Sequence, residues 1–250
     1  MKCWICGNLA DSGEHRIKKS DLIKIHGKGP YKDDQSLVMI KSGKEISIQG
    51  PNSKFLKYKK SLCKKCNGSG TQKYDDAYSI FIDYLDDKKN EILSKRIINL
   101  AEVYQTNVED KQRHLYKYFV KSYGCRVVEA GRAVPKHLVD IFQKKAFQTN
   151  LFITFAVNED KVNYLPESEK MVGNSNLLWS EQIDENGDFS ATYQEYYSYL
   201  HIYYWHNCGW NYGLGSRWLA DSLFLYLGSF SPLTPEQREE AKKLKETHGV

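Results

Sequence analysis

Apolar residues at every second position, Val38 and Ile40 and then Ile46 and Ile48, mark two short stretches in the first fifth of the chain, residues 37–41 and 45–49. This spacing is the period of a β-strand with one buried face. Ser42 and Gly43 lie between the two stretches, where small residues favour a tight turn. The pattern therefore predicts a β-hairpin.

Much of the remaining chain has the period of amphipathic helices, with apolar residues three and four positions apart. The expected helices cover residues 20–26, 75–85, 89–105, 108–123, 135–145, 216–227 and 235–247. The last one begins at Thr234-Pro235-Glu236-Gln237, a capping box with proline at the first helical position. Residues 151–157 are rich in β-branched and aromatic side chains and predict a strand, whereas the polar residues 160–190 predict a loop.

Residues 193–206 are dense in tyrosine and fit either a strand or a buried helix. Both alternatives stay open, because periodicity does not separate them. His201 and His206 lie in this stretch and are expected to be buried and hydrogen-bonded. The aromatic side chains suit the core of a monomer and, equally, a homodimer interface.

Composition places the chain among folded globular proteins, with 41% hydrophobic and 27% charged residues, and excludes a wholly disordered chain. The net charge of +5 is unevenly distributed. Residues 1–74 contain 16 basic and 6 acidic side chains, a net charge of +10, and the remainder carries −5. A segment with this much positive charge indicates a polyanion partner, although the basic side chains of many proteins contact only water.

Membrane insertion is not expected, because no apolar run approaches the roughly 20 residues that a membrane helix needs. The first residues also lack the apolar core of a signal peptide. The expected location is therefore cytoplasmic. Cysteines are reduced in that compartment, so paired cysteines indicate a metal more often than a disulfide.

Four of the six cysteines form two Cys-x-x-Cys pairs. These are Cys3 with Cys6 and Cys63 with Cys66. Such spacing lets a tight turn point both thiolates at one ion, and two such turns complete a structural zinc site. The alternative is two unrelated redox or chance pairs. Cys125 and Cys208 stand alone and are expected to be buried apolar residues.

An acid–histidine pair, Glu14-His15, follows the first cysteine pair, and Asn67 directly follows the second. A zinc ion that clamps both pairs would bring these side chains together. Carboxylate and amide oxygens are the hard ligands that Mg²⁺ prefers, and a nearby histidine can accept a proton from water near neutral pH. Asp75 and Asp76 either complete the metal ligands or cap the helix that starts there.

These motifs resemble a known family. In chain order, Cys-x-x-Cys, Gly-Glu-His-Arg-Ile-Lys-Lys-Ser and Leu-Cys-Lys-Lys-Cys-Asn are similar to the HNH endonucleases of the ββα-metal (His-Me finger) group. The resemblance covers residues 3 to about 85. It implies an α+β protein with a zinc-stapled ββα-metal nuclease domain at residues 1–88. Residues 89–250 would form a mostly helical accessory domain for specificity, regulation or dimerisation.

The resemblance also implies roles for single residues. Glu14 matches the metal-binding acid, His15 the general base, and Asn67 the third position of the motif. Glu14 and Asn67 would then hold a catalytic Mg²⁺ or another divalent ion. The middle Asn of the family falls at Tyr58, a departure that leaves the orientation of His15 to a backbone carbonyl or to Asn52. The implied activity is hydrolysis of phosphodiester bonds, with DNA as the expected substrate and RNA left open.

Phosphate contacts are expected from basic side chains near both cysteine pairs. These are Arg16, Lys18, Lys19, Lys57, Lys59, Lys60, Lys64 and Lys65. Residues 89–250 would select the target or bind an activator or partner protein, as expected of a defence or restriction nuclease. The alternative function is a zinc module that binds nucleic acid without catalysis.

Overall fold

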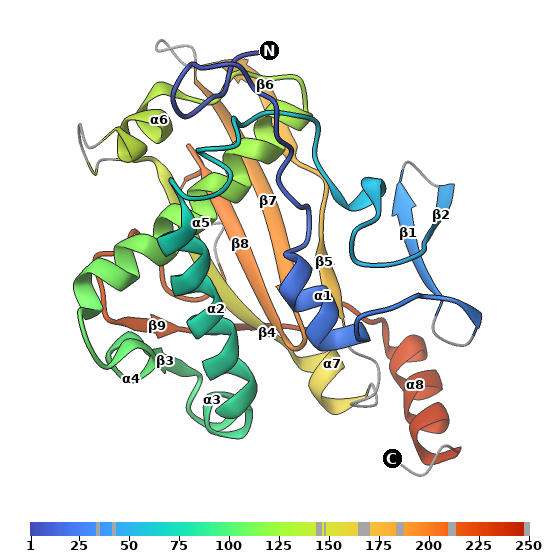
Figure 1. Cartoon of the computed structure of the whole chain (residues 1–250). Coiled ribbons are helices and arrows are strands. Elements are labelled where there is room, and N and C mark those ends of the chain that lie inside the picture. Colours follow the sequence, from blue (N-terminus) through green and yellow to red (C-terminus); the bar gives the residue numbers. More distant parts are fainter. Residues whose placement is uncertain are drawn as a thin grey trace.

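A six-stranded sheet forms the centre of the molecule in the computed structural model (Figure 1). The structure describes residues 1–33, 36–41, 44–143, 147, 149–164, 171–183, 188–209 and 214–247. The strand order is β10-β4-β8-β7-β5, and β6 also pairs with β7. The strands are β4 (Leu151–Asn158), β5 (Val172–Asn174), β6 (Leu178–Ile183), β7 (Phe189–Tyr197), β8 (Leu200–His206) and β10 (Gly228–Phe230). All pairs are antiparallel except β10 with β4.

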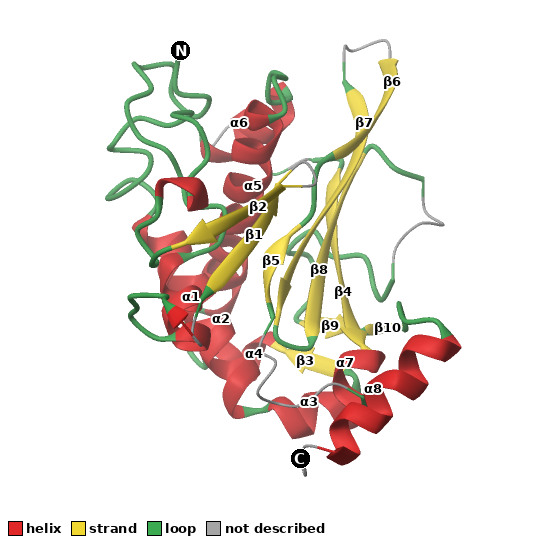
Figure 2. Cartoon of the chain, turned by 90° about the vertical axis from the view of Figure 1, so that its right-hand side faces the viewer, coloured by secondary structure: helices red, strands yellow, loops and turns green. Residues whose placement is uncertain are grey.

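Helices α2 (Gln72–Asp87) and α5 (Val108–Glu129) pack against each other on one side of this sheet (Figures 1 and 2). The rings of Phe81 in α2 and Phe119 in α5 each lie 6.0 Å from the ring of Phe155 in β4, measured between centroids. One hydrophobic core therefore runs from α2 through α5 to the sheet. This core continues across residue 88, where the sequence predicts a domain boundary, and the boundary itself stays a prediction.

Shorter elements surround these two layers. They are α1 (Lys19–His26), β1 (Leu37–Lys41), β2 (Lys44–Ile48), a 3-10 turn (Lys54–Leu56), α3 (Lys89–Lys95), β3 (Ile97–Asn99), α4 (Leu100–Tyr104), α6 (Lys136–Phe142), α7 (Glu159–Asn163), β9 (Phe224–Tyr226) and α8 (Pro235–Thr247). Strands β1 and β2 form the predicted hairpin, with Leu37 opposite Ile48. Its Ser42-Gly43 turn lies outside the described residues.

Several elements confirm the sequence predictions, including strand β4 and helices α2, α5 and α8. The capping box of α8 has both of its reciprocal bonds. The Thr234 N–H donates to Gln237 Oε1 at 2.9 Å, and the Gln237 N–H donates to Thr234 Oγ1 at 3.3 Å. Within the part of the chain that the structure describes, no helix is long and apolar enough to cross a membrane.

The α+β class is confirmed. The prediction that residues 89–250 are mostly helical is wrong, because this part of the chain contributes the whole central sheet. Residues 193–206 belong to β7 and β8, which resolves the open alternative in favour of strands. Strand β8 is hydrogen-bonded to β4 on one side and to β7 on the other. Short apolar runs look alike in a buried strand and a buried helix, and here the neighbouring strands decide.

Three further predictions within residues 89–250 are wrong for related reasons. The helix predicted at residues 216–227 is replaced by β9, which pairs with β3, and by a bridge from Trp218 to Ile153. Strand β3 also interrupts the helix predicted at residues 89–105. Residues 160–190 contain α7, β5 and β6 rather than only loop. Strands β3 and β9 stabilise each other although they are distant in sequence, which a local pattern does not reveal.

A close approach at Gly124 joins the N-terminal segment to α5. Trp4 lies directly over this glycine, and a Cβ atom at position 124 would be 2.5 Å from Trp4 Cζ2. The Trp4 indole also packs edge-on against Phe142, with ring centroids 5.3 Å apart. Glycine in the middle of a helix is unfavourable, so its presence here reflects the space that the indole requires.

We predict that Gly124→Ala lowers the free energy of unfolding, although alanine is the better helix former by about 1 kcal/mol. The added methyl must displace the packed indole, and overpacking of this kind costs about 1–3 kcal/mol. In a Trp4→Leu background the same substitution should become neutral or stabilising. Denaturant unfolding of the four proteins measures both effects, and equal effects in the two backgrounds would contradict the packing explanation.

Candidate functional site

The four paired cysteines converge on one point, as the spacing predicts. The sulfur atoms of Cys3, Cys6, Cys63 and Cys66 all lie within 4.8 Å of one another, and Cys6 Sγ is 3.7 Å from Cys63 Sγ. Four thiolates bound to one zinc ion at about 2.3 Å lie roughly 3.8 Å apart. The cluster can therefore hold a metal ion such as zinc.

Backbone hydrogen bonds form each cysteine turn. The Gly7 N–H donates to the Cys3 carbonyl at 2.8 Å, and the Asn67 N–H donates to the Cys63 carbonyl at 2.9 Å. The Cys66 N–H also points at Cys63 Sγ, at 3.4 Å, and this bond lowers the pKa of the Cys63 thiol to about 7. A lowered thiol pKa favours the thiolate, which is the form that binds metal, whereas burial raises the pKa of Cys6 and of Cys66.

The cysteine centre is packed against α5. Cys125 is fully buried in the same apolar cluster as Cys3, Ile5 and Leu62, as expected for a cysteine outside the pairs. Burial raises the pKa of Cys125 to about 12, so this thiol stays protonated. Cys208 is only partly buried, contrary to the expectation for it.

Two paired segments and a helix follow the cysteine turns. Residues 11–16 run antiparallel to residues 56–62, with Ser12 opposite Leu62 and His15 opposite Lys57. Gly13 is required here, because a Cβ atom at this position would lie 2.4 Å from the Tyr58 carbonyl oxygen. Helix α2 begins ten residues after this pairing ends. Two extended segments and a helix therefore follow one another in this order.

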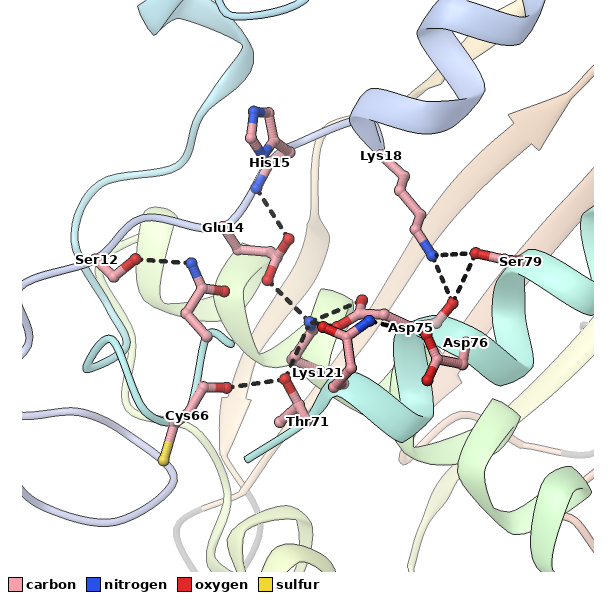
Figure 3. A network of polar contacts seen from close by, with 12 residues as sticks. Ser12, Glu14, His15, Lys18, Cys66, Thr71, Asp75, Asp76, Ser79 and Lys121 are labelled. Carbon is pink, nitrogen blue, oxygen red and sulfur yellow. Dashed lines mark hydrogen bonds and ion pairs between the residues drawn. The ribbon is translucent and has the colours of Figure 1, made fainter. Parts of the chain in front are cut away.

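His15 has an unpaired nitrogen. Its Nε2 atom is buried and has no hydrogen-bond partner among the described residues. Burial lowers the pKa of His15, and the positive charge of Lys57 lowers it further. Figure 3 shows the imidazole directed away from the Glu14 carboxylate. A neutral imidazole with an available nitrogen can accept a proton.

Glu14 belongs to the first paired segment, and Asn67 follows the second. Glu14 Oε1 accepts the His15 N–H at 3.1 Å, and Asn67 Nδ2 donates to Ser12 Oγ at 2.8 Å. Asn67 Oδ1 is buried and, within the described part of the chain, has no hydrogen-bond partner. Asn67 is thus connected to Ser12, two residues from Glu14, and presents an available amide oxygen.

The Glu14 carboxylate also binds Lys121, a residue that the sequence prediction missed (Figure 3). Lys121 is 1% exposed, and its Nζ atom lies 3.0 Å from Glu14 Oε2 and 3.1 Å from both oxygens of Asp75. Burial opposes the charge of Lys121, but the two carboxylates outweigh it and raise the pKa of its ammonium group. Burial raises the pKa of Asp75, an effect that the charge of Lys121 opposes. In the sequence, the buried role of Lys121 is indicated only by its position at the end of the apolar run Tyr118-Phe119-Val120.

Asp75 and Asp76 do not cap α2, and the alternative that they bind a metal stays a prediction. Asp75 is the second carboxylate that binds Lys121, and its backbone carbonyl accepts a hydrogen bond from Lys18 Nζ at 2.6 Å. Asp76 accepts a bond from Gln72 Nε2 at 2.8 Å on the exposed side of α2. No cap bond from either aspartate is present at the start of this helix.

The predicted phosphate-binding residues fall into two groups. Six are exposed, namely Lys19, Lys57, Lys59, Lys60, Lys64 and Lys65. Arg16 instead forms an ion pair with Glu129 and lies over the Tyr58 ring, 4.6 Å from its centroid. Lys18 donates to Ser79 Oγ at 2.9 Å in addition to the Asp75 carbonyl. These two cations are largely buried and need internal partners, so the structure does not place them on the surface with the others.

Tyr58 stands where the family has its middle Asn, and the orientation of His15 by a backbone carbonyl or by Asn52 stays a prediction. Tyr58 is buried, and its hydroxyl is 3.1 Å from that of Tyr193 in β7. Asn52 is exposed.

Comparison of the chain with protein-family models, with curated proteins and with solved structures gave no match. The site is therefore interpreted from its own geometry.

We predict that Cys63→Ser removes the metal from the four-cysteine centre and destabilises the segments around it. Metal-binding energy is folding energy in such a centre, because the ligands are not preorganised in the unfolded chain. Elemental analysis and thermal unfolding give the two readouts. Cys208→Ser, which changes a cysteine outside the centre, is the matched control and should retain the metal. Equal metal content in the two variants would contradict the assignment.

We also predict that Lys121→Met lowers the free energy of unfolding by about 3–5 kcal/mol, because it leaves two buried carboxylates without a counter-ion. Replacing both acids as well, by Glu14→Gln and Asp75→Asn, should recover much of the loss. Lys117→Met, on the same helix but partly exposed, is the control. Denaturant unfolding that gave the same small loss for both lysine variants would show that the Lys121 group is not structural.

Proposed function

We propose that the protein is a metal-dependent endonuclease of the HNH type that hydrolyses phosphodiester bonds, with DNA as the expected substrate. The observation that carries this proposal is His15, whose pKa is lowered and whose buried Nε2 has no hydrogen-bond partner among the described residues. A general base must be unprotonated at working pH and within reach of the proton that it removes. The lowered pKa of His15 meets the first condition.

The metal-binding part of the proposal rests on Glu14 and Asn67. Asn67 Oδ1 is a buried acceptor that receives no hydrogen bond from any described residue. Each oxygen of Glu14 has two lone pairs, so a carboxylate that binds Lys121 can still accept a second ligand. The two oxygens fit Mg²⁺, which would stabilise negative charge on the phosphate.

Within this proposal, His15 would take a proton from the water that attacks phosphorus. Lys57 and Lys19 carry the charges that lower the pKa of His15, which places both near the imidazole. Exposed lysines at that position suit the phosphates on either side of the scissile bond. Such contacts supply affinity with little sequence preference and weaken as salt rises.

A second candidate function is a zinc module that binds nucleic acid without cutting it. The observation that favours it is Lys121, whose ammonium already neutralises Glu14 and Asp75. A carboxylate satisfied in this way does not require a metal ion. Both candidates predict salt-sensitive binding to nucleic acid, so catalysis separates them.

We predict that the full-length protein cleaves nucleic acid in the presence of Mg²⁺ or Mn²⁺, and that His15→Ala lowers the rate by at least about 100-fold. Plasmid, single-stranded DNA and RNA are the substrates to test. His114→Ala, a partly exposed histidine on α5, is the matched control and should retain activity. Binding without cleavage of any substrate would favour the second candidate, and equal cleavage by the wild type and His15→Ala would remove His15 from the reaction.

The pH profile of this activity gives an independent readout. A lowered pKa keeps His15 neutral to lower pH, so the rate should rise through a pKa below the ordinary value of about 6.5 and stay level above it. Lys57→Met removes a charge that lowers this pKa, and should move the acidic limb to higher pH. Lys64→Met should leave the limb in place, because Lys64 is not among the charges acting on His15.

A further inference from the structure

Two histidines and an aspartate converge at the end of the central sheet, away from the four cysteines in the sequence. His137 Nε2 lies 3.1 Å from His206 Nε2 and 3.6 Å from Asp188 Oδ2. All three ligand atoms fall within 4.8 Å of one another. We propose that His137, Asp188 and His206 form a second metal site, which binds a divalent transition-metal ion such as Zn²⁺.

Three separate elements bring these side chains together. His137 is in the first turn of α6, Asp188 directly precedes β7, and His206 is the last residue of β8. Strands β7 and β8 are antiparallel with Ala191 opposite His206, so the start of one lies beside the end of the other. Figure 1 shows α6 at this same end of the sheet. Tertiary structure, rather than a sequence motif, creates the group.

The distances are also those expected of ligands around one metal ion. Nitrogen and oxygen ligands held at about 2.1 Å by one tetrahedral zinc ion lie roughly 3.4 Å apart, and the two measured separations of 3.1 and 3.6 Å bracket this value. A single N–H on His137 Nε2 cannot point well at both His206 Nε2 and Asp188 Oδ2. An ion placed between the three atoms could be bound by all of them together.

The surroundings hold the ligands in place and leave one side open. His206 is fully buried, and its ring packs against Tyr123 and Phe189 with centroids 5.8 and 5.3 Å apart. The side chains of His137 and Asp188 are 21% and 20% exposed, so an ion can reach the group from solvent. Three protein ligands leave a position for water or another small ligand, as in catalytic rather than structural zinc sites.

The ligand types also indicate which ions would bind. Two imidazoles and one carboxylate suit Zn²⁺, Fe²⁺ and similar ions rather than Mg²⁺, which prefers oxygen ligands. Cys208 lies two residues from His206, but its Sγ atom is occupied with the carbonyls of Ala191 and His206, at 3.5 and 3.4 Å. The second site therefore has no thiolate ligand, and this difference makes it distinguishable from the four-cysteine centre.

Metal content of the full-length protein tests the proposal. After dialysis against Zn²⁺ and removal of the excess, the wild type should hold two ions per chain by elemental analysis. His137→Asn and Asp188→Asn should each hold one ion, because each variant lacks a ligand of the second site. Both residues are partly exposed, so their replacement should leave the fold intact. His114→Asn is the control and should hold two. Circular dichroism shows whether each variant is folded.

Cobalt substitution identifies the ligands. The ion lost from His137→Asn should have visible d–d absorption without thiolate charge transfer, and the ion that remains should show the thiolate bands. Affinity for the second Co²⁺ should fall by roughly 100-fold or more when a ligand is removed, exceeding the effect of losing an outer-shell partner. A wild type that holds one ion at saturation, or variants that keep both ions, would overturn the proposal.

Discussion

One buried ammonium group holds together the three segments that form the candidate site. Lys121 of α5 binds Glu14 of the first paired segment and Asp75 of α2, with almost no exposure to water. Taking one cation and two anions out of water is costly, and the arrangement is stable only while each charge keeps its partner. The position of Glu14 therefore depends on α5, which is more than one hundred residues away in the sequence.

Helix α5 is the common support of the N-terminal segments and the sheet. Gly124 accommodates Trp4, Cys125 joins the apolar cluster of the cysteine centre, and Glu129 pairs with Arg16. On its other side, Ser122 donates to Glu195 of β7, a buried carboxylate whose pKa is raised by burial. A helix engaged in this way leaves little freedom for the residues around His15, which suits a site that must be preorganised.

Helix α6 connects the two groups of potential metal ligands. At its carboxyl end Phe142 packs on Trp4, and the following Gln143 donates to the Ile5 carbonyl at 3.1 Å. Near its amino end His137 faces His206. Five residues of helix, about 7.5 Å, separate the two contacts. The helix that carries His137 thus also packs against the segment of the first cysteine pair.

Local rules are enough for the features that the sequence predicts correctly. These features depend on residues a few positions apart. They are the Cys-x-x-Cys turns, the β1–β2 hairpin, the helical periodicity of α5 and the capping box of α8. The convergence of the two cysteine pairs also follows from sequence, because a single ion requires four ligands.

Other features depend on partners that no local pattern contains. Residues 216–227 have an apolar content that fits a helix, yet β3 and Ile153 pair with them as strands. Arg16 and Lys18 look like surface cations in the sequence, but Glu129 and the Asp75 carbonyl provide internal partners. The sequence by itself determines the cysteine centre, the acid–histidine segment and the principal helices. Only the tertiary structure brings Lys121 to Glu14 and His137 to His206, because those contacts join residues whose separation along the chain carries no signal.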